Sequence, residues 1–162
     1  MAKIIAFYNN KGGVAKTTTA TNIAGVLSLE NKKTLLIDGD PQGHASLTFG
    51  VDSDELETTL GAYLISGWTA KQASDYFIKI NDYLDIIPSN QTLSDFIVHA
   101  AAEPNDVRSK HLLNFVESVK KDYDYIIFDM APAVDIVLEN IVEIVDDLVV
   151  VATPETYAVK NA

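Results

Sequence analysis

The amino-acid sequence predicts a doubly wound, mostly parallel α/β sheet with helices on both faces. Short, continuous apolar runs recur along the chain, and such runs are typical of strands that are buried on both faces. Longer segments with apolar residues at helical spacing lie between most of these runs. This alternation of strands and helices is the pattern of parallel sheets, in which a helix connects one strand to the next.

The expected elements follow from these patterns in chain order. The first strand covers residues 4–8, and the helix behind the following glycine-containing turn has one apolar stripe, formed by Ala20, Ile23, Ala24 and Leu27. The remaining strands are expected at residues 34–37, 83–87, 125–128 and 148–152, the last as a buried strand, and the remaining helices at residues 60–65, 91–102, 109–121 and 134–145.

The composition is that of a globular protein. The 162 residues are 48% hydrophobic, which suits one domain with a real core, and no repeat or linker divides residues 1–162. The absence of cysteine excludes disulfides, thiolate catalysis and cysteine-ligated metal centres within this chain. No apolar run approaches the roughly 20 residues of a membrane span, and the N-terminus lacks the layout of a signal peptide. We therefore expect a cytoplasmic protein that does not bind a membrane.

The charges are unbalanced. The chain has 12 Lys and Arg against 23 Asp and Glu, a net charge of −11, which argues against a broad nucleic-acid surface. Residues 1–33 nevertheless contain five lysines and one glutamate, and Arg108 is the only arginine in the sequence.

Three polar segments, residues 11–18, 38–43 and 129–132, follow predicted strands, where α/β sheets place their ligands. The first segment joins a strand to a helix through a glycine pair. Small residues let backbone N–H groups close around phosphate oxygens, and the helix N-terminus adds partial positive charge. Lys16 can then reach the β and γ phosphates, and the Thr17 hydroxyl can bind Mg²⁺.

The general pattern GxxxxGK[ST] is not matched at Asn10 and Ala15, but a more specific variant is. KGGVAKTT resembles the deviant Walker A box of the ParA/MinD ATPases, and DGDPQG resembles the next motif of its ParA-type partition members. YDYIIFDMAP is similar to the family's Walker B strand, and DLVVVATPETYAV to a later strand and loop. These four segments lie in order and cover the chain from end to end.

The resemblance implies a P-loop NTPase fold that binds ATP and Mg²⁺ and acts as a nucleotide switch. In this family two ATP-bound subunits form a sandwich dimer, and the extra lysine of the box, here Lys11, reaches the partner's phosphates. Arg108 lies outside every motif, so Lys11 is the candidate catalytic cation, acting in trans. The residues implied in nucleotide binding are Lys11, Gly12, Gly13, Val14, Ala15, Lys16, Thr17 and Thr18.

Three carboxylates receive roles from the same resemblance. Asp129 matches the Walker B acid that holds Mg²⁺ through water, Asp38 supports the outer shell of the metal, and Asp40 matches the acid that positions the attacking water. Mg²⁺ usually keeps several waters, so only Thr17 need be a direct protein ligand. Taken without the phosphate loop, these acids would also suit ordinary turn, N-cap or strand-end residues.

The resemblance implies a partition ATPase that acts in plasmid or chromosome segregation. The implied partners are a second copy of the chain in an ATP-dependent homodimer and a centromere-binding protein of ParB type. Non-specific DNA would bind the full-length protein, which would then be nucleoid-associated, but would bind this chain weakly. Two alternatives stay open. One is a MinD-like positioning ATPase, which DPQG disfavours, and the other is a ParA-like interaction module that hydrolyses ATP weakly or not at all.

The sequence departs from the family pattern at three places. Ala15 replaces a glycine, and its Cβ would cost about 1–2 kcal/mol if that position needs positive φ. We therefore expect weaker or slower nucleotide chemistry rather than a dead site. Met130 replaces a threonine and removes a hydroxyl near the γ-phosphate. The chain is also short at its C-terminus, where the family carries its adenine-contacting loop and basic DNA-binding residues.

The histidines and aromatic residues have simpler interpretations. His44, His99 and His111 show no ligand spacing, so we expect surface or packing roles rather than metal binding. The aromatic side chains expected in the core or at an interface, rather than stacked on bases, are Tyr63, Trp68, Tyr76 and Phe77.

Overall fold

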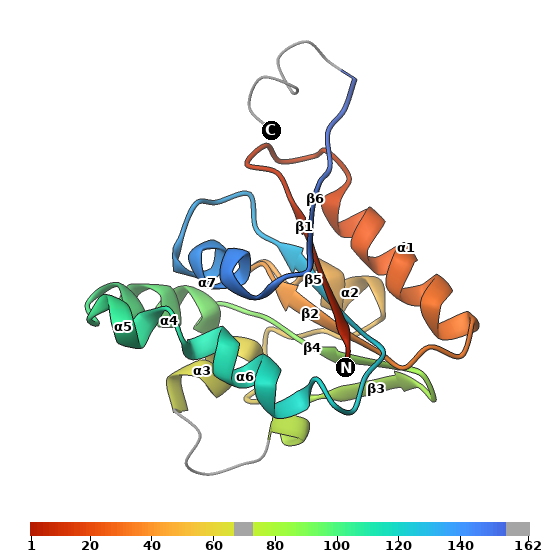
Figure 1. Ribbon diagram of the computed structural model, residues 1–162, viewed down its shortest axis with the longest axis horizontal. Helices are drawn as coiled ribbons and strands as arrows, with labels where there is room; N and C mark the ends of the chain where they lie inside the picture. The colour runs from red at the N-terminus through yellow and green to blue at the C-terminus, as the bar shows by residue number, and fades with distance from the viewer. Residues whose placement is uncertain (67–72, 155–162) are drawn as a thin grey trace.

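A computed structural model describes residues 1–66 and 73–154, and within them six strands form one sheet in the order β3-β4-β2-β5-β1-β6 (Figure 1). β3 runs antiparallel to β4, and every other neighbouring pair is parallel. The strands are β1 (Lys3–Tyr8), β2 (Thr34–Gly39), β3 (Ile78–Asn81), β4 (Leu84–Ile87), β5 (Tyr125–Met130) and β6 (Asp147–Val150).

Helices cover both faces of this sheet, as predicted. The buried residues of α1 and α2 share one core cluster with Phe7, Leu36 and Ile127, whereas α3, α4, α6 and α7 pack in a larger cluster on the other face. Figure 1 shows α1 and α7 on opposite sides of the sheet. The helices are α1 (Lys16–Leu29), α2 (His44–Thr48), α3 (Leu60–Ser66), α4 (Thr92–Ala101), α5 (Asn105–Arg108), α6 (His111–Val119) and α7 (Ile136–Ile144), with a 3₁₀ turn, η1, at Ala73–Tyr76.

The central strands β2 and β5 explain why the apolar runs were informative. Residues 34–39 and 126–130 are all buried, since helices pack on both faces and neighbouring strands lie on both edges. The doubly wound, mostly parallel fold class is confirmed. Four short elements were not predicted, namely α2, α5, η1 and the antiparallel strand β3, because each is too short to show a periodic pattern.

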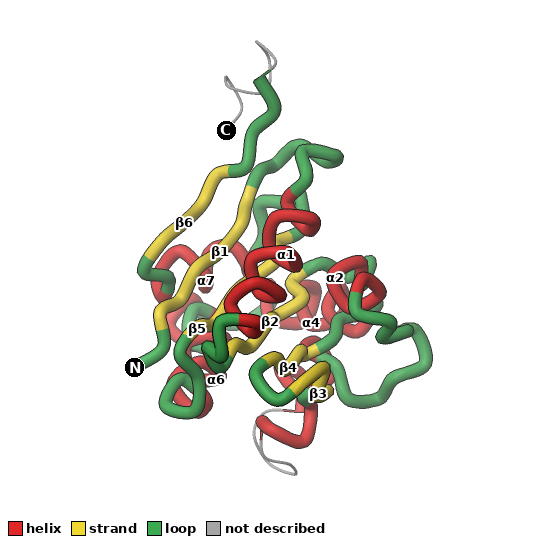
Figure 2. Tube along the Cα trace, turned by 90° about the vertical axis from the view of Figure 1, so that its right-hand side faces the viewer, coloured by secondary structure: helices red, strands yellow, loops and turns green. Residues whose placement is uncertain are grey.

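The prediction that the last strand is buried is wrong. Leu148, Val149 and Val150 in β6 are 40%, 37% and 43% exposed. β6 lies at the edge of the sheet, where it pairs with β1 and, among the described residues, has no neighbour on its other side (Figure 2). An apolar run thus identified a strand correctly but not its position in the sheet.

The apolar stripe predicted for α1 is only partly buried. Ala20 and Ala24 are buried, but Ile23 is 37% exposed, and the buried face instead includes Thr21 and Ser28. These two hydroxyls can be buried because each donates a hydrogen bond to a carbonyl of its own helix, Thr21 to Thr17 O and Ser28 to Gly25 O, both at 2.8 Å.

The aromatic residues lie where the sequence placed them, as far as the structure describes them. Tyr63 is buried and makes edge-to-face contacts with Tyr76 and Phe115, with ring centroids 5.1 Å apart in both pairs. Phe77 packs edge-on against Phe115 at 6.2 Å. Trp68 lies outside the described residues.

Candidate functional site

The carboxyl ends of the adjacent strands β2, β5 and β1 bring the three predicted polar segments together. Asp129 in β5 lies in register with Asp38 in β2 on one side and with Phe7 in β1 on the other. The strands approach closely here, because a Cβ on Gly39 would lie 2.8 Å from the Asp129 carbonyl oxygen. The order of the central strands therefore positions one compact site from segments far apart in sequence.

The phosphate-loop segment begins with a buried amide that the sequence did not reveal as important. Asn9 is 0% exposed, and its Oδ1 accepts a hydrogen bond from the Lys11 N–H at 2.7 Å. Its Nδ2 donates to the Val151 carbonyl oxygen at 2.9 Å. Asn9 thus ties the start of the loop to the chain just after β6. The available signal was only that Asn9 is the first polar residue after an apolar strand.

The loop then passes through two positive-φ residues, Gly13 at φ 74° and Ala15 at φ 70°. Ala15, with ψ 28°, is the left-handed N-cap of α1 and provides no side-chain cap to the helix. Ala15 therefore stands at a position with positive φ. Glycine adopts this conformation freely, whereas the Cβ of an alanine makes it unfavourable.

Lys16 folds back over the loop rather than into solvent. Its side chain is largely buried, and Nζ donates to the Lys11 carbonyl oxygen at 3.2 Å. Burial lowers the pKa of Lys16, and the charges of Asp129 and Asp40 oppose this shift. The ammonium group therefore faces the carboxylates at the strand ends. Of the other predicted binding residues, Val14 is buried, Thr17 is half-buried, and Lys11, Gly12, Gly13 and Thr18 are exposed.

Asp129 has the properties expected of a residue that serves a bound cation. It is 0% exposed, and neither carboxylate oxygen has a hydrogen-bond partner of normal geometry among the described residues. Burial raises its pKa to about 7, the neighbouring Thr17 hydroxyl and Lys16 lower it, and Asp38 and Asp40 raise it. A buried carboxylate without partners is costly, and a hydrated divalent cation beside Thr17 would satisfy it. The residues present therefore fit Mg²⁺.

No group of three His, Asp or Glu side chains within residues 1–66 and 73–154 is placed to hold a metal ion. His111 instead pairs with Glu103, with 2.5 Å between Nε2 and Oε2, and its ring lies edge-on to Phe96. A magnesium ion at this site would thus depend on Thr17, water and a ligand's own oxygens, which is the usual manner of nucleotide-bound Mg²⁺.

Asp38 is also fully buried, but its oxygens have protein partners. Oδ2 accepts from the Ser46 N–H at 2.8 Å and from the Ser46 hydroxyl at 2.6 Å, while Oδ1 accepts from the Asp40 N–H at 3.2 Å. Burial raises the pKa of Asp38 to about 6, and the bonds from Ser46 lower it. Asp38 therefore anchors the first turn of α2 as well as lying beside Asp129.

Asp40 lies half-buried on the turn between β2 and α2, and its Oδ1 accepts from the Gln42 N–H at 2.9 Å. Gly43, at the end of this turn, has φ 64° and packs closely against Ser53 and Ser89. A Cβ at this position would lie 2.6 Å from Ser53 Oγ and 2.8 Å from Ser89 O. Ser53 donates to Ser89 O, and the Asn90 amide donates to Ser53 O at 2.8 Å. Sequence reasoning missed this brace.

Met130 and Asp135 lead from the site into α7. Met130 is buried in the core, so the position where the family carries a hydroxyl is apolar here. Asp135 is the N-cap of α7, and its Oδ1 accepts from the N–H groups of Val137 at 3.0 Å and Leu138 at 3.2 Å.

No helix in the described part of the chain is long and apolar enough to cross a membrane.

Known proteins resemble this chain in both sequence and structure. The chain is 33% identical over 161 residues to the sporulation initiation inhibitor protein Soj of Bacillus subtilis, covering 99% of this chain and 62% of Soj. A plasmid partition protein from Borrelia burgdorferi superposes with a TM-score of 0.85 at 28% identity, covering 99% of this chain and 70% of that one.

Cobyrinic acid a,c-diamide synthase from Mycobacterium smegmatis, solved with a bound ATP analogue and magnesium, superposes with a TM-score of 0.88 at 26% identity, covering 98% of this chain and 63% of the synthase. The chain thus spans less than two thirds of the length of Soj and of the synthase. The family model AAA_31, described as an AAA domain, matches residues 2–162. The chain therefore belongs to the AAA_31 family, and its resemblance to the ParA/MinD-type P-loop ATPases is confirmed.

Proposed function

We propose that this chain is the nucleotide-binding part of an ATP- and Mg²⁺-dependent partition ATPase, which acts as a nucleotide-controlled dimer switch in plasmid or chromosome segregation. One observation carries the proposal. The left-handed loop at Gly13 and Ala15 opens the N-terminus of α1 beside the buried ammonium of Lys16 and the unpartnered carboxylate of Asp129.

The loop and the helix it opens would hold the triphosphate. Backbone N–H groups from Gly12 to Thr18 would donate to phosphate oxygens, and the N-terminus of α1 adds partial positive charge. Lys16 would leave the Lys11 carbonyl oxygen for the β and γ phosphates. Bound Mg²⁺ neutralises developing phosphate charge. Thr17 would be its direct ligand, and Asp129 and Asp38 would orient its water ligands.

The reaction needs one further cation and one group that orients water. Arg108, the only arginine of the sequence, forms an ion pair with Glu139 on α7, with 3.6 Å between Nη2 and Oε2. Lys11 is exposed in the loop, so its ammonium group would be able to reach the phosphates bound to a second subunit that faces it. Asp40, on the half-buried turn next to Asp38, would hold the attacking water.

The motifs favour partition over other activities of this fold. The synthase and the partition protein superpose about equally well, so the fold alone does not separate their activities. KGG at residues 11–13 and DPQG at residues 40–43 support the ParA type. A ParB-type protein would be the partner, the location would be the cytoplasm, and DNA would bind weakly to this chain, because its net charge is −11.

A second candidate is an interaction module that hydrolyses ATP weakly or not at all. The observation that favours it is the strained Ala15 at the N-cap of α1. A loop that must remain left-handed around a phosphate holds that shape less firmly with alanine than with glycine.

Two measurements test the proposal. Calorimetric titration with ATP in Mg²⁺ should give saturable binding that EDTA weakens and that Lys16→Ala abolishes, whereas Lys33→Ala, far along the chain from the loop, should bind as wild type. Phosphate release is then followed with and without DNA and a ParB-type protein. Turnover that DNA and the ParB-type protein stimulate supports the partition ATPase, binding with weak or no turnover favours the interaction module, and the absence of ATP binding contradicts the ATPase.

A further inference from the structure

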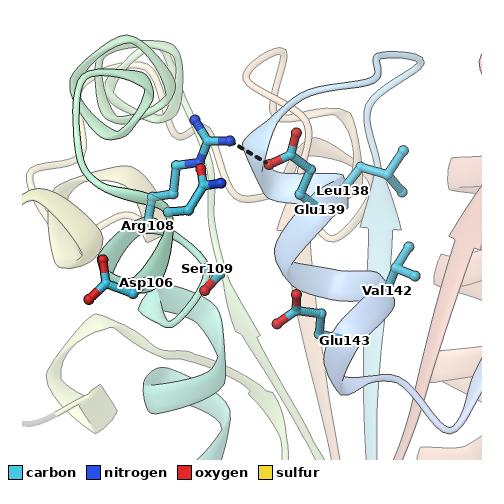
Figure 3. A pocket seen from close by; sticks show the side chains of 8 residues that line it. Asp106, Arg108, Ser109, Leu138, Glu139, Val142 and Glu143 are labelled. Carbon is cyan, nitrogen blue, oxygen red and sulfur yellow. Dashed lines mark ion pairs between the residues drawn. The ribbon is translucent and has the colours of Figure 1, made fainter.

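A groove of about 780 Å³ lies between α5 and α7, away from the phosphate loop, and no part of the proposed nucleotide chemistry uses it. Its lining comes from both helices, and Figure 3 shows Arg108 on α5 turned toward Glu139 on α7, whereas Leu138 and Val142 project from the side of α7 that is turned away from Arg108.

A buried amide holds the two walls together. Asn140 is 1% exposed, and its Nδ2 donates to the Arg108 carbonyl oxygen at 2.9 Å and to the Ile136 carbonyl oxygen at 2.8 Å. Its Oδ1 accepts from the Leu112 N–H at 3.3 Å. These bonds join α7 to the start of α6 and the end of α5. The groove is therefore preformed, and a ligand would not have to order it.

Apolar side chains are open to solvent along the groove. Leu138 is half-buried in its wall, and Val142, one turn further along α7, is 55% exposed. A hollow with an apolar wall and a polar rim is the form of surface that protein segments occupy.

The rim of this groove is acidic. Of the residues that line it, Asp106, Glu139 and Glu143 are acidic and Arg108 is the one base, and Arg108 is already paired with Glu139. No ion pair between described residues reaches Asp106 or Glu143. The groove therefore has a net charge of −2 and two carboxylates available to a cation from outside.

We propose that this groove docks a segment of another protein that carries a lysine or arginine next to an apolar side chain. The apolar group would contact Leu138 and Val142, and the cation would approach Glu143 or Asp106. A second copy is disfavoured because the chain carries 23 acids against 12 bases, and nucleic acid is disfavoured because phosphates are repelled by this rim. Since α7 begins at Ile136, a few residues after the 129–132 segment, the occupant would contact a helix that follows this segment along the chain.

A displayed library of random short peptides, selected on the immobilised chain, tests the proposal. The counter-target is the double variant Asp106→Lys/Glu143→Lys, and the matched control is Asp52→Lys/Asp54→Lys, which makes the same charge change on an exposed loop. Enriched peptides should carry Lys or Arg beside an apolar residue. They should bind the wild type and the control alike, but the groove variant at least about tenfold more weakly, and added salt should weaken them.

Circular dichroism and thermal unfolding show whether the groove variant folds, and Val142→Ser, which leaves every charge in place, provides a second variant that should also weaken binding. The proposal is overturned if no peptide is enriched, if enriched peptides are acidic or uncharged, or if the groove variants bind them as well as the control does. Concentration-dependent sedimentation that is lost only in the groove variant would assign the groove to a second copy instead, and would also overturn it.

Discussion

Asp38 and Asp129 are register partners on neighbouring strands, and both carboxyl groups are fully buried, yet only Asp38 accepts hydrogen bonds of normal geometry from described residues, from Ser46 and Asp40. The protein itself satisfies one acid of the pair and leaves the other for a ligand. This asymmetry agrees with a direct structural role for Asp38 and a cation-dependent role for Asp129.

Asp129 should make the ligand-free protein less stable as pH rises. Its pKa is raised from 3.8 to about 7 on folding, so its contribution is fully present below pH 4 and is lost as pH rises toward 7. The unfolding free energies of wild type and Asp129→Asn are measured by chemical unfolding. Between pH 4 and 7.5 the wild type should lose about 2–4 kcal/mol of unfolding free energy relative to Asp129→Asn. A difference independent of pH would contradict the buried, unpartnered state, and Asp54→Asn serves as an exposed control.

Ala15→Gly should stabilise the protein and strengthen nucleotide binding. Removing the Cβ at φ 70° relieves about 1–2 kcal/mol of strain in the folded protein. Glycine also gives the unfolded chain more conformational freedom, which lowers the stability by about 0.4–1 kcal/mol. The expected net gain, read from denaturant midpoints, is therefore several tenths of a kcal/mol. Asn31→Gly is the matched control, because Asn31 at φ 58° lies beyond the other end of α1. It should stabilise without changing ATP affinity, and equal affinities for all three proteins would separate Ala15 from function.

Lys11→Ala should bind ATP like the wild type but fail to form an ATP-dependent dimer. The side chain is exposed, and the contact that shapes the loop, from the Lys11 N–H to Asn9, belongs to the backbone and survives the change. Light scattering after size-exclusion chromatography, with and without ATP and Mg²⁺, measures the dimer. A variant that still dimerises with ATP would remove Lys11 from its role in trans.

Asp40→Ala should bind ATP and accumulate as the dimer, with hydrolysis reduced by two or more orders of magnitude, the usual scale for losing a group that positions a reactant. The fold should survive, because the side chain is half-buried and its hydrogen bond to the Gln42 N–H lies within one turn. Single-turnover phosphate release measures the effect, with Asp54→Ala as control. Undiminished release would assign Asp40 to the turn alone.

The parts of the site that are close in sequence could be predicted, and those joined through space could not. Lys16 and Thr17 lie within four residues of a glycine pair that follows a strand, so local spacing alone predicts them as phosphate and Mg²⁺ ligands. Asn9 could not be recognised, because its partner Val151 is 142 residues away. The burial of β6 was mispredicted because a strand's neighbours depend on the order of the whole sheet.

The hydrogen bond from Asn9 to the Val151 carbonyl oxygen connects the phosphate loop to the chain directly after the edge strand β6. β6 is held on one edge and exposed on both faces, so it should be among the first segments of the sheet to open in solution. Each opening would release the Asn9 amide and with it the Lys11 N–H. By reciprocity, any ligand that fixes the loop would slow amide exchange along β6, and any contact that covers the edge of β6 that has no neighbouring strand among the described residues would tighten the loop from a distance.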